Sequence, residues 1–267
     1  MRASLPMYDL PGLEEATDAW WSGLAAAFRS EGLENVPDRL TRSDDVAALW
    51  TAPDLLFSQT CGYPLTHALA GQVTLVATPV YACRGCTGGA YHSEILVRAV
   101  DPADSLAGLR GRRVAFNGDD SQSGYSALRH AVAGLAENGH FFGEAITSGG
   151  HRRSMAMVAG GEADVCAIDG VTFHLMKRTQ PALTERLRVL ASTADAPALP
   201  YITRRDLCEE DLERLRAGLR RAVADPALAE VREALLLADV VVRPLSDYQR
   251  ILELEEAAVA AAYPELA

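Results

Sequence analysis

Hydroxyl, amide and glycine residues are concentrated in one short segment, Gly118–Ser126, which reads Gly-Asp-Asp-Ser-Gln-Ser-Gly-Tyr-Ser. The segment follows the apolar run Val114–Phe116 and precedes residues with helical spacing of apolar side chains. Backbone N–H groups at the start of a helix lack partners within it, and neighbouring hydroxyl groups add donors. The segment therefore predicts a cradle for an oxyanion. A serine at this place also fits a simple helix cap, and both interpretations stay open.

Two further polar residues stand where a glycine-rich turn or a strand leads into a helix. His151 follows Ser148-Gly149-Gly150, so it falls in the first turn of the next predicted helix. Asp169 ends an apolar strand, where a carboxylate needs a hydrogen-bond partner or a protonated ligand oxygen. The alternative for His151 is an ordinary surface histidine.

Apolar runs and amphipathic stretches alternate along the chain, which is the pattern of an α/β fold. The length of 267 residues suffices for two lobes with separate cores. No flexible linker is present, so we expect strands to carry the chain between the lobes, with Ile95–Val97 and Val189–Ala191 as the candidates. The predicted division is a discontinuous lobe of residues 1–96 plus 195–267, with 97–194 as the inserted lobe.

The periodicity of apolar residues predicts the individual elements. Strands are expected at Ala3–Tyr8, Asp54–Ser58, Val73–Tyr81, Tyr91–Val100, Arg112–Asn117, Asp164–Ile168 and Arg188–Ala191. Helices are expected at Leu13–Phe28, Ser43–Trp50, 127–137, His151–Ala159, Thr172–Arg178, Glu209–Val223, Leu228–Leu237 and Ser246–Ala262.

The formal net charge of -11 argues against nucleic acid and anionic lipid surfaces as partners. An anion site in such a chain must work through short-range donors. No apolar stretch is long enough to predict a membrane span. Residues 1–6 contain no apolar signal core, which favours the cytoplasm, or the periplasm if an export signal was removed.

The order of these motifs resembles the phosphate/phosphonate-binding family of ABC-transporter solute receptors, which are type II periplasmic binding proteins. The resemblance rests on Asp-Asp-Ser-Gln-Ser-Gly-Tyr-Ser, on Gly-Gly-His-Arg-Arg-Ser with the following Ala-Asp-Val-Cys-Ala-Ile-Asp, and on Ala-Leu-Pro-Tyr-Ile-Thr. It covers the chain from Ala3 to about Ala224. It implies an α/β fold of two lobes, each a mixed, mostly parallel sheet flanked by helices, with a ligand cleft between the lobes.

The resemblance also implies which residues bind the ligand. The cradle of the family matches Ser121-Gln122-Ser123-Gly124, with Gln122 in place of a threonine, and His151 and Asp169 match its histidine and its acid. Tyr8 and Tyr91 match positions near the cleft mouth or hinge. The complete expected set is Tyr8, Gln59, Thr60, Tyr91, Ser121, Gln122, Ser123, Gly124, Tyr125, Ser126, His151 and Asp169.

The implied function is a solute-binding protein that captures a small oxyanion, phosphate-like or phosphonate-like, for an ABC transport system. Its expected partners are this ligand and a transporter permease, its expected state is a monomer or weak dimer, and no cofactor, metal or catalytic residue is expected. The alternatives are a cytoplasmic ligand sensor of the same fold and an enzyme that uses Cys61 with His67 or His151. Cys83 and Cys86 form a Cys-x-x-Cys pair, interpreted as plain thiols or a loop disulfide rather than a metal or redox centre.

Overall fold

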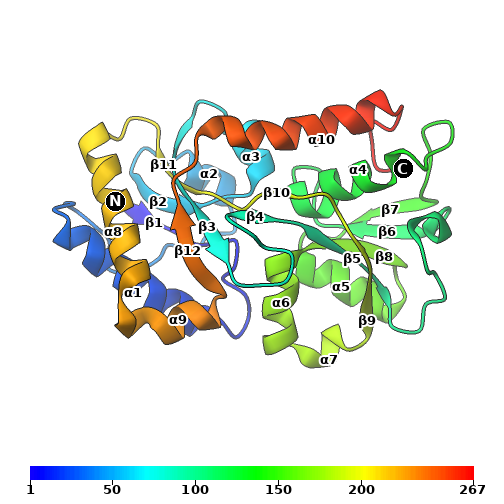
Figure 1. The fold of residues 1–267 in the computed structure, drawn as a ribbon, viewed down its shortest axis with the longest axis horizontal. Helices are drawn as coiled ribbons and strands as arrows, with labels where there is room; N and C mark the ends of the chain where they lie inside the picture. Colours follow the sequence, from blue (N-terminus) through cyan, green and yellow to red (C-terminus); the bar gives the residue numbers. More distant parts are fainter. The chain divides into compact units, whose positions relative to one another are not determined.

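A computed structural model describes all residues of the chain, 1–267 (Figure 1). The chain divides into two compact units. The first unit comprises Met1–Ala82, Cys86–Ala90 and Pro197–Asp247, and the second comprises Cys83–Gly85, Tyr91–Ala196 and Tyr248–Ala267. Each unit contains its own five-stranded sheet with helices packed against it, which confirms the α/β fold class.

The first unit has the sheet order β1-β2-β11-β3-β12. Its strands are β1 (Arg2–Ala3), β2 (Leu55–Gln59), β3 (Val73–Tyr81), β11 (Tyr201–Arg204) and β12 (Leu237–Val241). Its helices are α1 (Glu14–Ser30), α2 (Val46–Trp50), α3 (Gly62–Thr66), α8 (Glu209–Ala224) and α9 (Ala229–Ala234), with the short 3-10 turns η3 (Pro226–Leu228) and η4 (Leu245–Tyr248), the last residue of which belongs to the second unit.

The second unit has the sheet order β7-β6-β8-β5-β9. Its strands are β5 (Ser93–Arg98), β6 (Arg113–Phe116), β7 (Glu144–Thr147), β8 (Val165–Asp169) and β9 (Leu187–Ser192). Its helices are the 3-10 turn η1 (Leu106–Leu109), the π-helical turn η2 (Gln122–Ser126), α4 (Ala127–Ala133), α5 (His151–Gly160), α6 (Gly170–Thr179), α7 (Pro181–Thr184) and α10 (Gln249–Ala260).

Both sheets are mixed because one or two strands in each run against the others. In the second unit β6 is parallel to β7 and β8, whereas β5 is antiparallel to β8 and β9. In the first unit β1 and β2 are parallel, whereas β11 is antiparallel to β2 and β3, and β12 is antiparallel to β3. Two of the reversed strands, β5 and β11, are the first strands of a five-stranded sheet after the chain crosses from one unit to the other. The pairings around them are therefore antiparallel, although the prediction emphasised parallel pairing.

The cores follow from the predicted apolar patterns. In the first unit α1 buries Trp20, Trp21 and Phe28, and the rings of Trp21 and Phe28 pack against Phe57 of β2. In the second unit α4 turns Leu128 and Val132 into a cluster with Val114 and Val165 from the sheet. Burying a large apolar side chain contributes about 1.5–3 kcal/mol, so these contacts fix each helix on its own sheet.

Two of the points where the chain crosses between the units lie at short strands rather than at the expected ones. The assignment to a unit changes within β4 (Ala90–Tyr91) and within β10 (Ala196–Pro197), and these two strands form a two-stranded sheet. It changes again between Asp247 and Tyr248, so α10 belongs to the second unit, whereas the predicted division of 1–96 plus 195–267 and 97–194 placed it in the first. The reason is visible in the packing, since Ala258, Tyr263 and Leu266 join the core of the second unit.

Candidate functional site

The turn η2 places the predicted cradle between β6 and α4. Ser121 precedes it, and its Oγ accepts a hydrogen bond of 3.0 Å from the N–H of Gly124. The carbonyl oxygen of Ser121 accepts from the N–H of Ser126 at 3.0 Å, a bond across five residues that makes the turn wider than an α-helix. The N–H groups of Gln122 and Ser123 are therefore the first of the helix and have no hydrogen-bond acceptor within it.

Ser123 and His151 are directly bonded, with 2.9 Å between Ser123 Oγ and His151 Nε2. Burial lowers the pKa of His151 to about 4, so the ring is neutral near pH 7 and carries one proton. If that proton is on Nε2, the ring donates to Ser123 and leaves the serine O–H for a ligand. If it is on Nδ1, Ser123 donates to the ring and the Nδ1–H is left for a ligand. Either tautomer supplies one donor.

The start of α5 lies beside this pair. Gly150 is the N-cap residue and has no side chain to cap the helix, so the first N–H groups of α5 have no capping side chain. Ser148 supports the turn, because its Oγ bonds to Ser154 Oγ at 2.6 Å and accepts from the Gly150 N–H at 3.3 Å. An uncapped helix start favours a negative charge through its donors and its dipole.

Gly124 is required by the close approach of Asn117. A Cβ atom on Gly124 would lie 1.8 Å from Asn117 Oδ1 and 3.3 Å from His151 Cε1. Asn117, Gly124 and His151 therefore form one contiguous surface with Ser123. Asn117 was not among the residues expected in the site. Its position directly after β6, at the carboxyl end of a strand, was the signal that could have found it.

Several buried polar atoms of this region have no hydrogen-bond partner in the protein. They are Asn117 Oδ1, Gln122 Nε2, Gln122 Oε1, Ser126 Oγ and His151 Nδ1. Most buried polar groups in folded proteins are paired, so a concentration of unpaired ones within one turn and its neighbours indicates a place for a bound polar group.

The acidic residues of this region differ in burial and in their partners. Asp169 is almost fully buried, and its Oδ1 accepts from the N–H of Thr172 at 2.8 Å, which caps α6. Asp119 and Asp120 are exposed. The nearby arginines pair elsewhere, Arg112 with Asp101 and Arg113 with Asp164. The two exposed aspartates are thus held by neither arginine.

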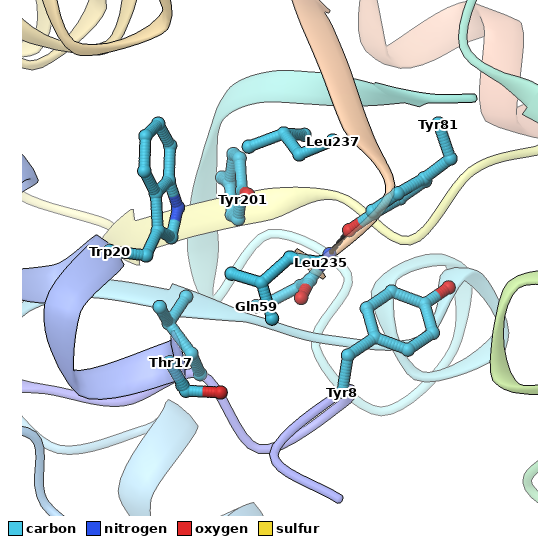
Figure 2. A pocket seen from close by; sticks show the side chains of 9 residues that line it. Tyr8, Thr17, Trp20, Gln59, Tyr81, Tyr201, Leu235 and Leu237 are labelled. Carbon is cyan, nitrogen blue, oxygen red and sulfur yellow. Dashed lines mark hydrogen bonds between the residues drawn. The ribbon is translucent and has the colours of Figure 1, made fainter. Parts of the chain in front are cut away.

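Tyr8 and Gln59 lie in the first unit, around a small cavity of about 30 Å³ (Figure 2). Gln59 Nε2 donates to Tyr81 Oη and to the carbonyl of Leu199, both at 3.0 Å, so its N–H groups are already used. The rings of Tyr8 and Tyr81 meet edge to face. A cavity of this size has room for about one water molecule. Ligand binding by Tyr8 and Gln59 stays a prediction.

The remaining predicted residues, Thr60, Tyr91 and Tyr125, lie in different settings, and Tyr125 is only partly buried. The Thr60 N–H donates to the carbonyl of Pro200 in the first unit, and Tyr91 is buried at the end of β4. The Tyr125 ring packs against Phe116, and its hydroxyl accepts from the N–H of Leu266. Tyr125 thus ties the C-terminal segment to η2. The structure brings together Ser121, Gln122, Ser123, Gly124, Ser126 and His151, all in the second unit.

The cysteines divide into two groups. Cys83 and Cys86 are disulfide-bonded, which agrees with one of the two expectations for the pair. Cys61, Cys166 and Cys208 are thiols, and burial raises the pKa of the Cys166 thiol. No group of three or more His, Cys, Asp and Glu side chains could hold a metal ion. No helix has the length and apolar character to cross a membrane.

One protein family matches the sequence over most of its length. The model of the family described as "ABC transporter, phosphonate, periplasmic substrate-binding protein" matches residues 52–248. The match contains η2, α5 and β8, and with them every site residue of the second unit described above. A search of curated proteins finds no match.

Solved structures with the same fold cover nearly the whole chain. The binding protein component of an ABC phosphonate transporter from Pseudomonas aeruginosa has a TM-score of 0.78 and 17% identity, covering 98% of this chain and 87% of its own. PhnD1 from Prochlorococcus marinus, solved in complex with methylphosphonate, has a TM-score of 0.75 and 15% identity, covering 96% and 97%. XAC2383 from Xanthomonas citri, solved with bound ATP, has a TM-score of 0.71 and 17% identity, covering 98% of both chains. At these identities the likeness establishes the two-lobed fold.

Proposed function

Because this chain belongs to the family of periplasmic substrate-binding proteins of phosphonate ABC transporters, we propose that it binds a small phosphonate-like or phosphate-like oxyanion at η2 and the start of α5. Family membership makes the chain a solute-binding protein rather than an enzyme, with a small molecule as ligand and a transporter permease as partner. The ligand class and the residues that hold it are the proposal.

The observation that carries the proposal is the bond between Ser123 and His151. It brings the hydroxyl groups of η2 next to the uncapped start of α5, so two sets of donors converge on one place. A neutral His151 adds no positive charge, and the chain has a net charge of -11. Affinity must therefore come from hydrogen bonds to the anion, each of which contributes about 1.5–3 kcal/mol.

Two solved structures support the ligand class. PhnD1 was crystallised with methylphosphonate and XAC2383 with ATP, so both bind a molecule with oxygen atoms on phosphorus. The earlier expectations that no nucleic acid is bound and that the protein is a monomer or weak dimer remain predictions. Asp169 also remains a proposed ligand contact because it lies at the end of β8, although its Oδ1 caps α6.

The test is calorimetry with methylphosphonate, inorganic phosphate and phosphite. We expect at least one of them to bind the wild-type protein, and Ser123→Ala to weaken that binding by about 1–2 kcal/mol. Some loss of thermal stability is expected as well, because Ser123→Ala also removes the buried bond to His151. Ser105→Ala is the matched control, since Ser105 is an exposed serine of the same unit whose side chain caps nothing.

Two results would contradict the proposal. If none of the three anions binds, the ligand class is wrong. If an anion binds and Ser123→Ala leaves its affinity unchanged, the ligand class stands but the site does not.

A further inference from the structure

The side-chain amide of Gln122 is buried without a partner on either of its polar atoms. The residue is 1% exposed, and neither Nε2 nor Oε1 has a hydrogen bond. Exchanging the two atoms by rotating the amide changes nothing, because one donor and one acceptor remain unpaired in both orientations. A ligand that satisfies this amide must offer both an acceptor and a donor.

Asn117 adds a second unpaired acceptor next to the Ser123–His151 pair. Its Oδ1 is buried and unpaired, and it lies where a side chain on Gly124 would be, next to the ring of His151. The side chains of Asn117 and Gln122 come from the two ends of the loop between β6 and η2. The site therefore contains unpaired oxygen atoms in addition to the hydroxyl and N–H donors described above.

A fully deprotonated oxyanion cannot satisfy such a set. Its oxygen atoms accept hydrogen bonds only, so they would pair with the N–H and O–H donors and leave the amide oxygens unpaired beside a negative charge. A phosphonate or phosphate that keeps one acidic hydrogen has an O–H group to donate. The second proton of a phosphate group is lost only near neutral pH, whereas a sulfonate carries no proton there.

We propose that Asn117 and Gln122 make this site selective for an oxyanion that retains an acidic hydrogen, such as a hydrogen phosphonate or hydrogen phosphate, over sulfonates and sulfate. This inference rests on the proposed function, because it concerns the same site. It assigns to Gln122 the selection of the ligand, with the amide oxygen receiving the ligand O–H and the amide N–H donating to a ligand oxygen.

The experiment compares methylphosphonate with methanesulfonate, which has nearly the same shape, by calorimetry on the full chain. We expect the wild-type protein to bind methylphosphonate at least about tenfold more tightly. In Gln122→Met, which keeps the side-chain length and removes both polar atoms, this ratio should fall several-fold through weaker methylphosphonate binding. Gln72→Met is the matched control, since Gln72 is exposed in the first unit, and it should leave the ratio unchanged.

The outcomes separate this inference from the proposed function. Equal affinity for the two anions, or a ratio that Gln122→Met does not change, overturns the selectivity and leaves oxyanion binding intact. Failure of both anions, and of phosphate and phosphite, overturns the proposed function and the selectivity with it. If Gln122→Met does not fold, Asn117→Ala gives the same test, with the same expected fall in the ratio and the same overturning result.

Discussion

Ser123 Oγ and His151 Nε2 lie 2.9 Å apart, and this contact joins the turn η2 to the first residue of α5. The two residues are far apart in sequence, and each alone looks like a common surface feature. Together they form a hydrogen-bonded pair with a defined orientation, because each side chain sits on an ordered element. Ser123 belongs to the turn capped by Ser121, and His151 is the first residue of α5. The properties of this pair can be measured independently of any ligand.

His151 should make stability depend on pH. The ring titrates at about 4 in the folded protein and near 6.5 in the unfolded chain, so the unfolded chain binds the proton first as the pH falls. Stability is therefore fully present above pH 6.5 and declines as the pH drops toward about 4, by roughly 3 kcal/mol. His151→Asn should remove this part of the decline in urea unfolding curves. The exposed His140 gives the control His140→Asn, and identical pH profiles for wild type and His151→Asn would contradict the burial of the ring.

Ser121 and Ser123 should differ in what they stabilise. Ser121→Ala removes the acceptor of the Gly124 N–H, and we expect the free energy of unfolding to fall by about 1 kcal/mol, as for other N-cap residues. Ser123→Ala removes the buried bond to His151, so it should also lower stability, and in addition it should weaken ligand binding directly. Melting curves and ligand titrations of the two variants check this, and unchanged ligand affinity in Ser123→Ala would contradict its role in the site.

Gly124→Ala should disturb the site more than its small size suggests. The added methyl group would overlap Asn117 Oδ1 at 1.8 Å, so Asn117 must move away from His151, and we expect a loss of about 1–3 kcal/mol in stability together with weaker ligand binding. Gly134→Ala is the control, because Gly134 follows α4 with open space around it. Normal binding and stability in Gly124→Ala would show that Asn117 is free to leave this position.

The cysteines should react in two classes. Alkylation of the unfolded protein without a reductant should label the three thiols Cys61, Cys166 and Cys208, and reduction beforehand should raise the number to five. In the folded protein Cys208 should react first, since it is exposed, and Cys166 last, since burial raises the pKa of its thiol. Mass spectrometry measures both, and five labels without reduction would exclude the Cys83–Cys86 disulfide.

The strongly periodic elements could be predicted from the sequence, and the elements with weak local signals could not. The helix stripe of Trp20, Trp21 and Phe28 and the apolar run of β3 appear in the structure almost as expected, because burial dictates their pattern. The edge strand β7 was missed because its side chains are mostly exposed. The predicted helix 228–237 ends early, since Leu236 adopts a left-handed backbone with φ of 57° and turns the chain into β12 without any glycine or proline to signal it.

In the site, features that depend on neighbouring residues could be predicted, and contacts between residues far apart in sequence could not. A capping serine could be predicted from the position before a helix, but not that Ser121 rather than Ser123 would be the cap. The convergence of Ser123 with His151 was expected only through the resemblance to the family. The position of Asn117 directly after β6 could have marked it as a candidate, but its place beside His151 could not be predicted, because it depends on the absence of a Cβ at Gly124, seven positions later. The wide turn η2, which precedes the predicted helix 127–137, could not be predicted either. A hydrogen bond across five residues does not change the spacing of apolar side chains.

The exposed pair Asp119 and Asp120, next to η2 and paired with neither Arg112 nor Arg113, has a kinetic consequence. An anion that approaches η2 is repelled by these two exposed charges, which are close to η2 in sequence, in a protein whose overall charge is already negative. Capture should therefore be slowed by repulsion over roughly one Debye length, about 8 Å at physiological ionic strength. Added salt would then speed association while leaving dissociation almost untouched, the reverse of electrostatic steering.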